Sequence, residues 1–135
     1  MDDNKFFITN NNIYTKIKYN SFSNIYKIKI DEDIEINDII EYTNKVYVLT
    51  TKGLYYIEEN EYGENVAIEV DNCKADCSIP YIYEKKLYVI GDNKLYVLDD
   101  DNKLVLIKEF EGSSTSIISF SIYDDTYFIF FENII

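Results

Sequence analysis

The chain has 135 residues, which is enough for one domain with a hydrophobic core. Hydrophobic residues make up 47% of it, as in globular proteins, and the net charge is −12. No Arg is present, and the strong negative charge disfavours direct binding to the phosphates of nucleic acids. The absence of His removes Ser-His-Asp, Cys-His and His-metal chemistry, so we expect a non-catalytic protein without a cofactor.

The N-terminal and cysteine-containing segments bear on the cellular compartment. The chain opens with the acidic residues Asp2 and Asp3, and no apolar run is long enough for a signal peptide or a membrane span. Cys73 and Cys77 have three residues between them, and neither a His nor a second Cys pair is present to complete a metal site. We therefore expect reduced thiols, a cytoplasmic location and no membrane partner.

Taken in chain order, the predicted elements are short strands that recur with a period of about 40 residues. Apolar runs rich in Tyr, Ile, Val and Phe, separated by turns of Asn, Asp, Gly or Glu, indicate strands. From Lys5 to Lys45 is 40 positions, and from Lys45 to Lys86 is 41. The predicted strands are Lys5–Thr9 and Asn12–Ile17; Ile39–Thr43, Lys45–Thr50, Gly53–Glu58 and Ala67–Val70; Ser78–Glu84, Lys86–Gly91, Lys94–Leu98 and Leu104–Phe110; and Thr115–Tyr123 and Thr126–Phe131.

Four antiparallel strands in about 40 residues are typical of a β-propeller blade. We therefore predict an all-β fold of about three four-stranded, antiparallel, propeller-like blades. Residues 1–135 then form one repeat domain, with units near 5–38, 39–77 and 78–114 and a partial unit at 115–135. A closed propeller needs at least about four blades, so we expect oligomerisation or further chain to complete this one.

Two segments carry a resemblance to known propeller families. The run Lys86-Leu87-Tyr88-Val89-Ile90-Gly91-Asp92-Asn93-Lys94-Leu95-Tyr96-Val97-Leu98-Asp99 resembles a blade of the PQQ-like (quinoprotein-type) propellers. The run Thr51-Lys52-Gly53-Leu54-Tyr55-Tyr56-Ile57 is similar to the two-component-regulator propeller repeat. The Trp that docks between quinoprotein blades is absent from this sequence, so the resemblance implies the fold but no cofactor and no catalytic residue.

The C-terminal run Tyr127-Phe128-Ile129-Phe130-Phe131 is uncharged and aromatic, and it is the candidate assembly edge. Left uncovered, such a strand is a template for aggregation. Three arrangements would cover it: a second copy of the chain in a closed dimer, continuation of a longer propeller, or folding of the units into a barrel or sandwich. We expect a homo-oligomer, most simply a dimer, or another protein partner.

Turns at one end of the predicted blades form a candidate binding face of small polar residues. They are Asn11, Asn12, Thr51, Lys52, Asp92, Asn93, Ser113 and Ser114. Loops on a rigid scaffold commonly carry binding sites, but the same residue types are also ordinary turn formers. The recurring tyrosines, among them Tyr47, Tyr55 and Tyr88, either stack on sugars or fill the core between blades.

These features favour a non-catalytic scaffold that mediates protein–protein interaction. Two alternatives are open. The same loops would suit a propeller that binds a small ligand or glycan, and the charge of −12 would suit an acidic decoy or inhibitor of a basic partner.

Overall fold

A computed structural model describes the backbone of residues 5–8, 13–18, 21–70, 74–110 and 117–132, and side chains from residue 27 onward. The described residues form an all-β fold, as predicted, and contain no helix. Their strands are β1 (Lys5–Ile8), β2 (Ile13–Lys18), β3 (Ser21–Lys29), β4 (Ile36–Tyr42), β5 (Lys45–Thr50), β6 (Gly53–Glu59), β7 (Asn65–Glu69), β8 (Cys77–Tyr83), β9 (Lys86–Gly91), β10 (Lys94–Leu98), β11 (Leu104–Glu109), β12 (Ile117–Tyr123) and β13 (Thr126–Phe131).

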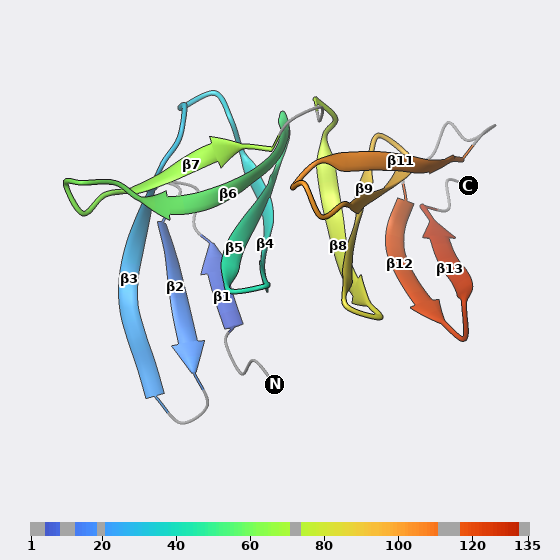
Figure 1. Ribbon diagram of the computed structural model, residues 1–135, viewed down its shortest axis with the longest axis horizontal. Coiled ribbons are helices and arrows are strands. Elements are labelled where there is room, and N and C mark those ends of the chain that lie inside the picture. The colour runs from blue at the N-terminus through green and yellow to red at the C-terminus, as the bar shows by residue number, and fades with distance from the viewer. Residues whose placement is uncertain (1–4, 9–12, 19–20, 71–73, 111–116, 133–135) are drawn as a thin grey trace.

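The strands are grouped into three sheets (Figure 1). A seven-stranded sheet has the order β1-β2-β3-β7-β6-β5-β4. A four-stranded sheet has the order β11-β10-β9-β8, and β12 pairs with β13 in a separate hairpin. Strands β4 to β7 and β8 to β11 are therefore two successive up-and-down meanders, as the predicted strand runs of the second and third units require.

The first unit departs from the expectation of a separate blade, because its strand β3 joins the second unit. Strand β3 pairs in parallel with β7 through Ile28–Asn65 and Lys29–Val66. Ile28 is buried against Ile39 and Val48, and this packing places the end of β3 beside β7. The edge strands β1 and β4 also contact each other, so the seven-stranded sheet is curled into half of a barrel. Of the three arrangements considered, this part of the chain is nearest to the barrel.

The hairpins β4–β5, β8–β9 and β12–β13 share one register. Ile40 pairs with Tyr47, Tyr81 with Tyr88, and Ser121 with Phe128. Each hairpin also has the same irregularity near the start of its first strand, between Ile36/Asp38, Cys77/Ile79 and Ile117/Ser119. A β-bulge re-aims the strand that contains it, and the register shift lies at the same position in all three hairpins. The repeat read from the sequence is thus repeated in the backbone geometry.

The turns of these hairpins also match. Both central residues have positive φ, with values of 49° and 62° at Thr43 and Asn44, and 48° and 65° at Glu84 and Lys85. The third turn, Asp124-Asp125, has 50° and 55°. Two successive positive φ angles are the signature of the type I′ turn, whose twist matches that of the flanking strands.

The Thr43 turn gives a stability prediction. A β-branched residue is strained at positive φ, whereas Asn tolerates that region. Replacing Thr43 with Asn is expected to raise the free energy of unfolding by about 1 kcal/mol, measured by urea denaturation. Asp124→Asn exchanges two residue types that both tolerate positive φ, and it should leave the denaturation midpoint unchanged. A lower midpoint for the Thr43 variant would show that the turn is unstrained.

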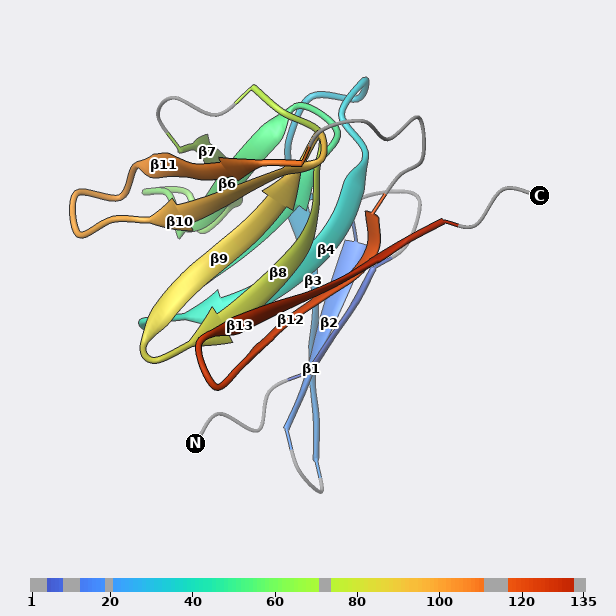
Figure 2. The same ribbon diagram turned by 90° about the vertical axis from the view of Figure 1, so that its right-hand side faces the viewer.

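Two of the three clusters of the hydrophobic core lie between successive sheets, which pack face to face (Figure 2), and the third is formed within the seven-stranded sheet. A central cluster between the second and third units includes Tyr47, Leu49, Leu87 and Val89. A C-terminal cluster between the third unit and β12–β13 includes Ile90, Leu95, Phe120 and Ile122. An N-terminal cluster contains Ile28, Ile39 and Val48. Because neighbouring residues of a strand face opposite sides, β5 and β9 each contribute to two clusters.

Candidate functional site

Four of the eight loop residues predicted to form a binding face make contacts within the fold. Asn11, Asn12, Ser113 and Ser114 lie outside the described residues. The backbone N–H of Thr51 donates to the Glu35 carbonyl at 3.0 Å, and the Thr51 hydroxyl accepts from the Glu35 N–H at 3.2 Å. In the next unit, the Asp92 N–H donates to the Asp76 carbonyl at 3.3 Å. These two turns therefore hold the segments that lead into β4 and β8.

The other predicted loop residues continue this pattern. The side-chain oxygen of Asn93 accepts from the backbone N–H of Ile117 at 3.2 Å, which ties the third unit to the start of β12. The Lys52 ammonium pairs with the Asp33 carboxylate, and this contact lowers the pKa of Asp33 and raises that of Lys52. A cross-unit contact, from the Asn37 amide to the Cys77 carbonyl at 2.7 Å, lies at the same end of the strands. At the loop end, contacts within a unit hold the segments that lead into β4 and β8, and the side chains of Asn37 and Asn93 connect one unit to the next.

The recurring tyrosines that the structure describes are buried or partly buried. Tyr47 is 2% exposed, and its hydroxyl donates to the side-chain oxygen of Asn102 at 2.8 Å. Tyr55, Tyr88 and Tyr96 are partly buried, and each packs against one of the three clusters. A ring buried between sheets is not available to stack on a sugar. The side chain of Tyr14 is outside the described set.

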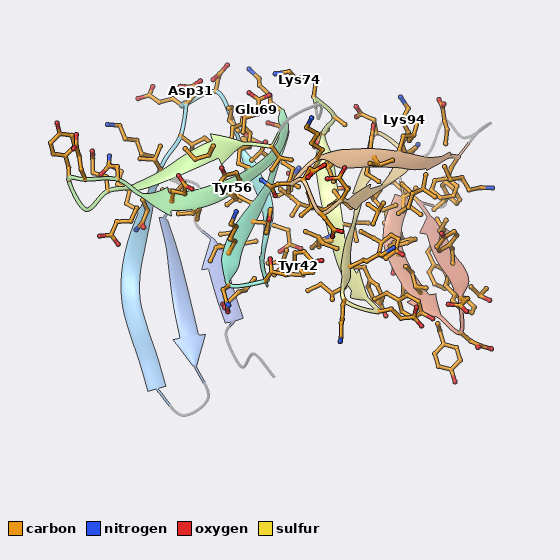
Figure 3. The ribbon with its side chains drawn as sticks, viewed as in Figure 1. Asp31, Tyr42, Tyr56, Glu69, Lys74 and Lys94 are labelled. Carbon is orange, nitrogen blue, oxygen red and sulfur yellow. The ribbon has the colours of Figure 1, made fainter. Side chains whose placement is uncertain are left out.

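A second set of tyrosines, which the sequence reading missed, links each hairpin to the next. Tyr42, between β4–β5 and the following sheet, donates to the backbone carbonyl of Lys85 at 2.7 Å (Figure 3). Tyr83, the equivalent residue one unit later, donates to the Asp125 carboxylate at 2.8 Å and accepts from the Asp125 N–H at 3.0 Å. In both cases the partner is the second residue of the next type I′ turn. Tyr42 and Tyr83, which are 41 positions apart, therefore each bind the hairpin that follows.

The third tyrosine of this series, Tyr123, has no following hairpin among the described residues. It ends β12 at the position of Tyr42 and Tyr83, and it is 75% exposed. Two aromatic residues of β13 on the same side, Phe128 and Phe130, are 44% and 60% exposed. Their counterparts in β5, Tyr47 and Leu49, are in the central cluster. We call Ser119, Ser121, Tyr123, Phe128 and Phe130 the open face.

The predicted assembly edge is thereby divided between two sides of β13. Ile129 packs into the C-terminal cluster, and Tyr127 faces the same side, with its ring 6.0 Å from the Phe120 ring and 40% of its surface exposed. Phe128 and Phe130 are on the open face, and Phe131, the last residue of the strand, is partly exposed. The signal for this division was in the sequence, because the strand period of two assigns alternate residues to opposite faces.

The remaining polar chemistry is sparse. Cys77 is fully buried beside Gly91, and Cys73 lies outside the described residues. Within the described ranges, no group of three or more His, Cys, Asp or Glu side chains is placed to hold a metal ion. Among the same residues there is no helix with the length and apolarity needed to cross a membrane.

The chain was compared with family models, with curated proteins and with solved structures, and none of the three comparisons found a match.

Proposed function

We propose that this chain is a non-catalytic scaffold of the β-propeller type that binds protein through the open face. The observation that carries the proposal is the exposure of Tyr123, Phe128 and Phe130 at positions whose counterparts in earlier units contact the next sheet. Contiguous exposed apolar side chains of this kind typically mark protein-interaction sites.

The propeller assignment rests on the two complete meanders and the last hairpin. Their common register, common bulge and face-to-face packing are the properties of blades that follow one another around a ring. The resemblance of Lys86–Asp99 to quinoprotein blades agrees with this assignment. The parallel pairing of β3 with β7 belongs to the first unit alone and lies outside the blade scheme.

The glycan-binding alternative has less support than protein binding. Tyr47 is a core residue, Tyr55, Tyr88 and Tyr96 pack against the core, and Thr51, Lys52, Asp92 and Asn93 make contacts that hold the loops. The open face, by contrast, combines aromatic rings with the hydroxyl of Tyr123. The equivalent hydroxyls of Tyr42 and Tyr83 bind atoms of a protein turn. Tyr and Phe are enriched in the buried centres of protein interfaces.

The test is affinity capture with the tagged chain, followed by mass spectrometry. Proteins captured through the open face should be lost when the bait carries Phe128→Ser and Phe130→Ser. The control bait carries Val105→Ser and Ile107→Ser, two exposed apolar residues of β11. Capture that is equal for all three baits would overturn the open face as the binding surface.

A further inference from the structure

The open face lies on the last of the packed sheets. A surface that could bind it is present elsewhere in the chain, in the first unit. In the second unit, Val46 and Val48 pack on the side that faces the first unit. In the third unit, the equivalent residues Leu87 and Val89 pack on the side that faces the second. The repeat of 40 positions aligns Phe6 and Ile8 of β1 with Val46 and Val48 in the sequence. The sequence of β1 is thus that of a strand whose apolar residues pack against a preceding sheet.

The two ends of the chain also differ in charge. Residues 5–30 contain five lysines and no acidic residue; the lysines are Lys5, Lys16, Lys18, Lys27 and Lys29. Residues 117–132 contain Asp124, Asp125 and Glu132 and no lysine. The first unit is therefore basic within an otherwise acidic chain, and the hairpin that carries the open face is acidic. Opposite charges at the two ends favour contact between unlike ends and oppose contact between like ends.

We infer that the partner of the open face is the first unit of a second copy of this chain. This inference rests on the proposed function and names its partner. In the contact, the open face of one copy covers β1 and β2 of the other, so the interface continues the sheet packing found within the chain. The interface joins unlike surfaces, and the smallest closed assembly contains two copies.

The first measurement is the mass of the full chain by light scattering after size exclusion, over a range of concentration and salt. We expect a species of twice the chain mass that dissociates as salt rises, because the contact pairs basic with acidic segments. A chain that is monomeric at every concentration would overturn the inference.

Two variants, one at each end, test which surfaces meet. The open-face variant carries Phe128→Ser and Phe130→Ser, and the basic-end variant carries Lys5→Glu, Lys16→Glu and Lys18→Glu. Each variant alone should be monomeric, because every contact between two copies would include one altered surface. An equimolar mixture should regain a one-to-one complex, because one copy keeps its open face and the other keeps its basic end.

Controls of the same chemistry keep the result interpretable. Val105→Ser with Ile107→Ser removes exposed apolar surface elsewhere, and Lys94→Glu, Lys103→Glu and Lys108→Glu reverse three charges of the third unit. Both control proteins should associate as the wild type does, and circular dichroism checks that all variants are folded. Association that survives the basic-end changes but not the open-face changes would mean that like ends meet, and it would overturn the inference. If no self-association occurs but the captured proteins still depend on Phe128 and Phe130, the proposed function stands and only its partner is wrong.

Discussion

Leu95→Ala is expected to lower the free energy of unfolding by about 2–5 kcal/mol, the range for truncating a fully buried leucine. Leu95 is 0% exposed and lies in the C-terminal cluster, with Phe120 and Ile122 of the last hairpin. Its truncation leaves a cavity at the contact between two sheets, where β12–β13 depends on side-chain packing more than on backbone pairing. The loss should therefore be measured by urea denaturation with tyrosine fluorescence.

The matched control for this experiment is Leu106→Ala on the neighbouring strand β11. Leu106 pairs with Tyr96 in the ladder but is 50% exposed, so the same truncation removes little buried surface. We expect a change of about 0.5 kcal/mol or less. Equal effects at the two positions would show that β12–β13 is not packed against the third unit as described.

The protein is expected to lose stability steeply above pH 10. Burial raises the pKa of Tyr47, Tyr55 and Tyr88 above the ordinary value of 10.0. For a group that is neutral when protonated, a raised pKa in the folded state favours the protonated form. The unfolded chain therefore releases these protons first as the pH rises, so the stability that these three tyrosines contribute is fully present below pH 10 and is lost above it.

Tyr47→Phe tests the contribution of a single ring to this alkaline transition. The variant loses the hydrogen bond to Asn102, so it should be less stable than the wild type at neutral pH. Its stability should nevertheless depend less on pH above 10, because one of the groups with a raised pKa is gone. Denaturation midpoints at neutral and alkaline pH, together with tyrosinate absorbance, give both quantities. An unchanged alkaline slope would mean that Tyr47 ionises as readily when folded as when unfolded.

The sequence was sufficient for the local structure of the second and third units. Alternating apolar residues with two-residue turns specify hairpins, and the predicted run Lys86–Gly91 coincides with β9. The union of β3 with β7 could not be predicted, because a parallel pair is set by how the sheets pack and not by strand periodicity. Ile28 makes that contact and is buried against the second unit. The sequence around Ile28 looks like that of any other strand, so it did not indicate the parallel pairing.

For the candidate site, the sequence indicated the segment but not the surface. The sequence predicted that the aromatic run Tyr127–Phe131 forms an assembly edge. Which of its residues are buried, such as Ile129, and which are exposed, such as Phe128, depends on the register with β12. The loop residues Thr51 and Asp92 were chosen for their polarity. Polarity does not distinguish a residue that binds a ligand from one that holds a neighbouring segment, and in the structure both residues bond the segment that leads into a strand.

The shared bulge of the three hairpins has a consequence for how such a chain can change in length. From the bulge at Ile36 to that at Cys77 is one complete module, and Ile117 begins the next. Because Tyr42 and Tyr83 contact the following hairpin in an equivalent way, an in-frame duplication of the module between the bulges at Cys77 and Ile117 would give each new junction an equivalent partner. Copy number is therefore a variable that evolution can adjust one module at a time, with each added module contributing a similar increment of stability.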